Sequence, residues 1–62
     1  MTIMDLIDLD LRQSFNEYIG LGITEHKQAI TLAKRDVIEM YGLTSRYDSG
    51  LIEHLNAVAL AY

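Results

Sequence analysis

The sequence has 62 residues, carries a formal net charge of −4 and contains no cysteine. A chain of this length is one domain at most and lies near the lower limit at which a hydrophobic core holds a fold. The lack of cysteine excludes disulfides and thiolate metal sites, and the acidic balance argues against a protein that depends on nucleic-acid phosphates. Half of the residues are apolar. Because so small a chain hides this share with difficulty, self-association is the simplest remedy.

The N-terminal residues are acidic where a secretory signal would need a basic region. Nowhere does the chain approach 18 consecutive apolar residues, the length typical of a membrane-spanning helix. We therefore expect neither a targeting segment nor a membrane segment, and a cytoplasmic protein.

The first predicted helix runs from about Met4 to Ile19. A strand is the alternative, because residues 7 to 11 alternate between apolar and acidic, but this alternation stops at Arg12 while the helical pattern continues for four turns. Asp8 and Arg12 have the i,i+4 spacing of a helical ion pair. The apolar stripe of this helix consists of Met4, Ile7, Leu11, Phe15, Tyr18 and Ile19.

The second predicted helix, from Thr24 to Gly42, carries both a start and a stop signal. Thr24 is expected to cap the first turn, and Gly42 to adopt the left-handed conformation that ends a helix. Residues 20 to 22, Gly-Leu-Gly, break the chain before it, which predicts an antiparallel hairpin with the first helix. The face that the second helix turns to the core is predicted to hold His26, Ala29, Ile30, Ala33, Val37, Met40 and Tyr41.

A third helix is expected to follow the polar residues 44 to 50. Asp48 or Ser49 is its predicted cap, with a start at Gly50 or Leu51, although Ser45 with Asp48 would make an earlier capping box. The helix is predicted to run to the chain end and is apolar on nearly every side, and such a helix is normally buried on more than one side. It therefore predicts a dimer or partner interface, to which two surplus leucines of the first helix are added: Leu6, Leu9, Leu51, Leu55, Val58, Leu60 and Tyr62.

Residues 23 to 33 resemble residues 51 to 61, with Glu, His, Ala, Leu and Ala in register. A true repeat would indicate similar packing of the two segments, whereas helical segments rich in Ala, Leu and Glu also match by chance. The two Glu-His pairs in these segments suggest a metal site. Adjacent residues project about 100° apart on a helix, so neither pair chelates a metal alone, and we predict no metal and no cofactor.

No pattern in the chain indicates catalysis. The serines lack a glycine-framed nucleophile elbow, and there is no glycine-rich phosphate loop. We therefore predict that the protein is not an enzyme.

A small transcription regulator is one alternative function, because residues 33 to 58 read as helix, turn and helix. The turn after Gly42 is longer than the three or four residues usual in this motif. The would-be recognition helix carries Glu53 and neither Lys nor Arg, so direct nucleic-acid binding is not expected.

A second alternative treats the acidic residues as the functional surface. Spaced carboxylates imitate DNA phosphates and would inhibit a DNA-binding protein, whereas the competing interpretation is a charged surface kept for solubility. The acidic surface in question is Asp5, Asp8, Asp10 and Glu17.

Taken together, these patterns predict an all-α protein with one domain over residues 1–62. The predicted architecture is a three-helix bundle, a helical hairpin plus a C-terminal helix, completed by dimerisation. Its predicted function is a regulatory or structural protein–protein interaction module that acts as a homodimer and binds another protein. Arg46 and Tyr47 in the second loop are the predicted partner-binding residues, because Arg and Tyr are favoured at binding hot spots.

Overall fold

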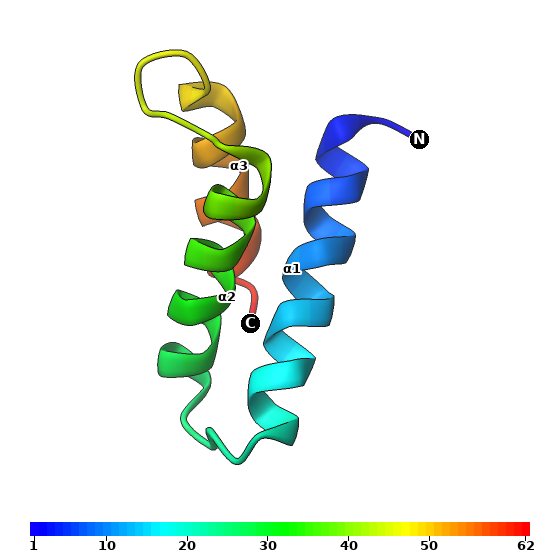
Figure 1. Ribbon diagram of the computed structural model, residues 1–62, viewed down its shortest axis with the longest axis vertical. Coiled ribbons are helices and arrows are strands. Elements are labelled where there is room, and N and C mark those ends of the chain that lie inside the picture. The colour runs from blue at the N-terminus through cyan, green and yellow to red at the C-terminus, as the bar shows by residue number, and fades with distance from the viewer.

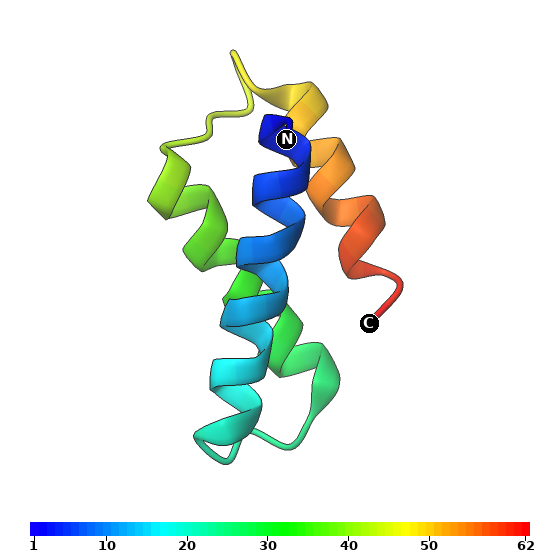
Figure 2. The ribbon, with the colours of Figure 1, turned by 90° about the vertical axis from the view of Figure 1, so that its right-hand side faces the viewer.

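The computed structural model describes all 62 residues and contains three helices and no strand: α1 (Ile3–Gly20), α2 (His26–Tyr41) and α3 (Ser49–Ala59). α1 and α2 form an antiparallel hairpin, and α3 packs against both of them (Figure 1). Turning the molecule by 90° shows α1 in front, between α2 and α3 (Figure 2). The predicted all-α, three-helix architecture is confirmed. None of the helices combines the length and the apolar character that a bilayer crossing requires.

α1 begins earlier than the predicted Met4, because Thr2 caps it. The Thr2 hydroxyl oxygen accepts the Asp5 backbone N–H at 3.2 Å, and the Asp5 carboxylate accepts the Thr2 backbone N–H at 3.0 Å. This reciprocal pair is a capping box, which satisfies two donors that the helix itself leaves free. Hydrogen bonding from the Thr2 backbone, reinforced by the Thr2 side chain, lowers the pKa of Asp5 below its ordinary value, because both bonds favour the charged carboxylate.

The N-cap of α2 lies one residue later than expected. Glu25, not Thr24, occupies the N-cap position, with extended backbone angles and no side-chain capping bond. The predicted cap at Thr24 is therefore wrong. The C-terminal prediction is confirmed: Gly42 has φ 63° and ψ 36°, and the next N–H, that of Leu43, reaches back to the Ile38 carbonyl at 3.0 Å.

α3 is offset from its prediction at both ends. Asp48, one of the two predicted caps, occupies the N-cap position, and the helix begins at Ser49, one residue before the predicted Gly50 or Leu51. The Asp48 side chain makes no capping bond, and its carboxylate accepts the Thr44 backbone N–H at 3.0 Å. The helix stops at Ala59 and does not run to the chain end. Residues 60–62 form a tighter turn, in which the Tyr62 N–H donates to the Ala59 carbonyl at 3.1 Å.

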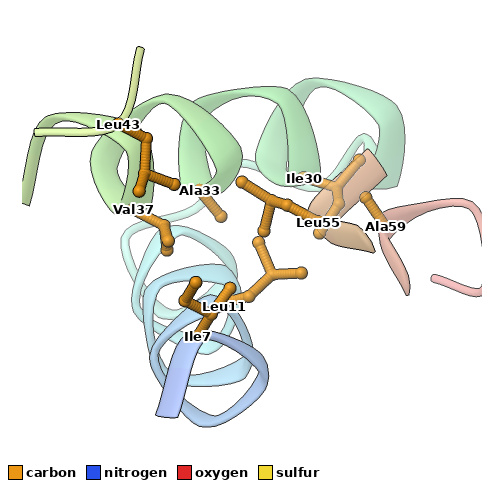
Figure 3. Packing of buried hydrophobic residues seen from close by; sticks show 8 residues of the cluster. All are labelled: Ile7, Leu11, Ile30, Ala33, Val37, Leu43, Leu55 and Ala59. Atoms are coloured by element: carbon orange, nitrogen blue, oxygen red, sulfur yellow. The ribbon is translucent and has the colours of Figure 1, made fainter. Parts of the chain in front are cut away.

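The core forms where the three helices meet. In Figure 3 the apolar side chains of α1 point toward the space between α2 and α3, and Leu11 reaches toward Leu55. Met4 and Met40, predicted on the inward faces, are 42% and 61% exposed, in the first turn of α1 and the last turn of α2, and neither belongs to this cluster. The buried cluster consists of Ile7, Leu11, Ile30, Ala33, Val37, Leu43, Leu55 and Ala59.

Candidate interaction surface

Polar side chains along both flanks of α1 hold the neighbouring helices. On the flank toward α3, a carboxylate oxygen of Asp8 lies 2.8 Å from Nε2 of His54. On the flank toward α2, the Tyr41 hydroxyl donates to the Asp10 carboxylate. The expected Asp8–Arg12 ion pair does not form: no Lys or Arg nitrogen lies within 4.0 Å of a carboxylate oxygen, and Asp8 contacts His54 instead.

A third polar contact joins α1 to α2, since the Tyr18 hydroxyl donates to the Asp36 carboxylate at 2.5 Å. In both tyrosine–aspartate pairs the hydrogen bond to the carboxylate raises the pKa of the phenol above its ordinary value of 10.0. The physical cause is that the neutral phenol donates, whereas a phenolate beside a carboxylate would be repelled.

The four acids proposed as a phosphate-like surface are separated by these contacts. Asp5 belongs to the capping box, while Asp8 and Asp10 hold different helices on opposite flanks of α1. Only Glu17 makes no side-chain hydrogen bond. The acids therefore do not gather into one free acidic face.

Two shallow hollows lie on the surface of α1 and adjoin at Asp8 and Arg12. The larger, of about 360 Å³, lies between α1 and the C-terminal residues, and the smaller, of about 210 Å³, lies on α1 itself. Arg12 lines both and has no carboxylate partner within the chain. The larger hollow is lined by Asp8, Arg12, Val58, Ala61 and Tyr62, and the smaller by Asp5, Asp8, Leu9 and Arg12.

The predicted interface residues fall into three groups by exposure. Leu6, Leu9 and Leu60 are 39%, 47% and 89% exposed. Leu55 is fully buried in the core of the single chain and offers no surface to a partner. The partly buried members, which pack against that core, are Leu51, Val58 and Tyr62. The apolar face of α3 is thus largely used within the chain, and free apolar surface lies mainly elsewhere.

The predicted partner-binding loop is exposed and locally ordered. Tyr47 is 78% exposed, and the Arg46 guanidinium carbon lies 5.3 Å from the centre of its ring, a cation–π geometry. The Thr44 hydroxyl accepts the Tyr47 backbone N–H at 3.2 Å, and Asp48 accepts the Thr44 N–H. These bonds fold residues 44–48 into one turn that presents Arg46 and Tyr47 to solvent.

The two Glu-His segments pack differently, contrary to what a structural repeat would require. His26 is exposed and meets the edge of Phe15 at 5.5 Å between ring centres, whereas His54 binds Asp8. No three His, Asp or Glu side chains are grouped closely enough to hold a metal ion. The Tyr62 ring also packs on Phe15, at 5.0 Å between ring centres. This contact was not predicted from the sequence, because it depends on the turn after α3.

The fold and these surfaces define a small three-helix protein in which polar side chains join α1 to both of the other helices. Comparison with protein-family models, with curated proteins and with solved structures produced no match.

Proposed function

We propose that this protein is a non-enzymatic interaction module that works in the cytoplasm as a helical homodimer, with a regulatory or structural role. The observation that carries the proposal is its exposed apolar surface. Only ten of 62 residues are buried, whereas nine large apolar side chains are between 39% and 91% exposed. They are Met1, Ile3, Met4, Leu6, Leu9, Leu21, Met40, Tyr47 and Leu60.

Single exposed apolar residues are ordinary, but their concentration on α1 is informative. Five of the nine lie in or just before the first half of that helix, at residues 1 to 9. A concentration of exposed apolar side chains on one element is typical of a protein–protein contact. A second copy of the chain is always present at equal concentration, and covering this surface removes it from water without any other partner.

Sedimentation velocity over a range of protein concentrations tests the proposal. We expect a helical species of twice 7.0 kDa that dissociates on dilution. A helical monomer at every concentration would overturn the homodimer. Far-UV circular dichroism of the same samples reports whether the chain is folded in each state.

The Arg46–Tyr47 loop is proposed as the contact with a different protein. Immobilised wild-type protein and a Tyr47→Ala variant should be compared for what they retain from a cell extract. A protein that binds the wild type and is lost with Tyr47→Ala supports this contact. Equal retention by both forms would exclude the loop as the binding surface.

A further inference from the structure

We propose that the homodimer forms through the outward face of α1, by an antiparallel contact about a two-fold axis near Leu9. This inference rests on the proposed homodimer and specifies its interface. The residues that carry it are Asp5, Leu9 and Arg12, which fall within about 60° of one another at 100° per residue. Leu9 lies about 200° around the helix from the buried Ile7, so this face points away from the core.

The outward face is free to bind. Asp5, Leu9 and Arg12 are all exposed, and together they line the smaller hollow of about 210 Å³. Asp8, the carboxylate spaced to neutralise Arg12 within the helix, is held by His54 at 2.8 Å. Arg12 is therefore left as a cation without a carboxylate partner, beside an exposed leucine.

The order of charges selects the second copy as the occupant and fixes its direction. Asp5 stands at the N-terminal side of Leu9 and Arg12 at its C-terminal side. In an antiparallel pair centred on Leu9, Asp5 of one copy lies within one residue, about 1.5 Å along the axis, of the level of Arg12 in the other. Two opposite-charge pairs then flank a leucine–leucine contact.

A parallel arrangement is disfavoured by the same residues. It would place Asp5 beside Asp5 and Arg12 beside Arg12 of the second copy, so that like charges repel. Asp5 and Arg12 also lie only about 20° apart around the helix, on the same side of Leu9. In an antiparallel dimer the two-fold axis is perpendicular to both helices. Such an axis places Asp5 and Arg12 of both copies on the same side of the leucine–leucine contact, so each Asp5 meets an Arg12. The outward face is thus complementary to itself only in the antiparallel direction, as an isologous interface requires.

Charge reversal and charge exchange in the full chain test the pairing. Arg12→Glu and Asp5→Arg each place like charges together twice in the dimer, and we expect each to raise the dissociation constant at least about tenfold. The double variant Asp5→Arg/Arg12→Glu restores opposite charges across the axis, and its dissociation constant should return to within about threefold of the wild type. Asp5→Arg also removes the capping carboxylate, but the double variant shares that loss, so recovery there reports the interface.

Sedimentation velocity of the four proteins supplies the measurement, with Arg35→Glu on α2 as a control that changes the net charge as Arg12→Glu does. Far-UV circular dichroism identifies any variant that fails to fold. Weaker dimerisation of the wild type at about 0.5 M than at about 0.05 M salt is the second expected result, because salt screens exposed charges.

Three results would contradict the α1 interface. If the wild type dimerises and the single reversals match Arg35→Glu, the dimer uses another face and only this inference fails. If a folded double variant stays as weak as the single variants, the Asp5–Arg12 pairing is wrong. If the wild type is a monomer throughout, the inference and the homodimer fail together.

Discussion

Leucine occurs on both the inward and the outward face of α1, but its environment differs between them. Inward, Ile7 and Leu11 are completely buried against α2 and α3. Outward, Leu9 is 47% exposed between charged neighbours. The same residue type, two positions away, therefore stabilises the single chain in one case and is available to a second chain in the other.

The boundary between the two faces is marked by hydrogen-bonded carboxylates. Asp8 meets His54 of α3 on one flank, and Asp10 meets Tyr41 of α2 on the other. Each carboxylate is hydrogen-bonded where apolar packing gives way to solvent, and neither lies within 4.0 Å of the Arg12 guanidinium. The contacts that assemble the monomer thus also leave the outward face with an unpaired positive charge.

The largest expected effect separates the two faces directly. Leu11→Ala should lower the free energy of unfolding by about 2–5 kcal/mol, because it opens a cavity in a closely packed core. Leu9→Ala should change it by no more than about 0.5 kcal/mol at concentrations where the chain is monomeric, since Leu9 is 47% exposed and lies outside the buried core. Urea titrations followed by circular dichroism measure both. Similar losses for the two variants would show that the faces do not differ as described.

A smaller effect on stability is expected at Gly42, the residue that ends α2 and directs the chain back toward the core. Gly42 has φ 63°, and the following Leu43 is buried in the core. Gly42→Ala should lower the free energy of unfolding by about 1 kcal/mol, because alanine is strained in this left-handed conformation. The added Cβ would meet nothing within 4 Å, so no clash contributes. The control is Gly50→Ala in the first turn of α3, where a Cβ is also unobstructed and the change should stabilise by up to about 0.5 kcal/mol. Opposite signs in the two urea titrations are the expected result, and a loss at both positions would contradict it.

Sequence periodicity predicted most of the inward face and little of its edges. The three-to-four spacing correctly placed Ile7, Leu11 and Leu55 on inward stripes, because burial follows the helical repeat wherever a neighbouring helix lies alongside. It did not reveal that Asp8 would bind His54, 46 positions away, since helix crossing geometry decides such contacts. The apolar character of the third helix suggested a partner surface, yet a single chain already covers Leu55 and Ala59.

The candidate site was partly predictable for the same reason. Leu6 and Leu9 were identified as surplus apolar residues because they lie off the stripe, and both are exposed. Arg12 was missed, because its i,i+4 spacing from Asp8 suggested a local ion pair. Local spacing competes with tertiary partners for the same carboxylate, and in this fold the tertiary partner is closer.

Removing the N-terminal cap tests how much the capping box stabilises the first turn of α1, which carries Asp5 of the outward face. Thr2→Ala removes the hydroxyl that accepts the Asp5 N–H and should cost about 0.5–1 kcal/mol. The expected result is faster amide hydrogen exchange confined to the first turn, with the centre of α1 unchanged. Thr31→Ala on the exposed side of α2 is a suitable control, since its hydroxyl only donates to the Lys27 carbonyl within the same helix. Uniformly faster exchange along α1 would instead mean that the cap supports the whole helix.

The smallest effect concerns the tyrosine–aspartate bonds at the edges, and it is visible only at alkaline pH. The pKa of Tyr41 is raised in the folded chain by its bond to Asp10, so the folded state holds the phenol proton more tightly than the unfolded state does. This stabilisation is complete below the unfolded value near 10.0 and is lost as the pH rises through the higher folded value. Urea titrations from about pH 9 to about pH 11 should therefore show a decline in stability that is shallower in Tyr41→Phe. Tyr47→Phe, which removes an exposed phenol without a carboxylate partner, should keep the wild-type decline. Identical slopes for the wild type and Tyr41→Phe would mean that the Asp10 contact does not persist in solution, and that the α2 edge of α1 is more open than the structure shows.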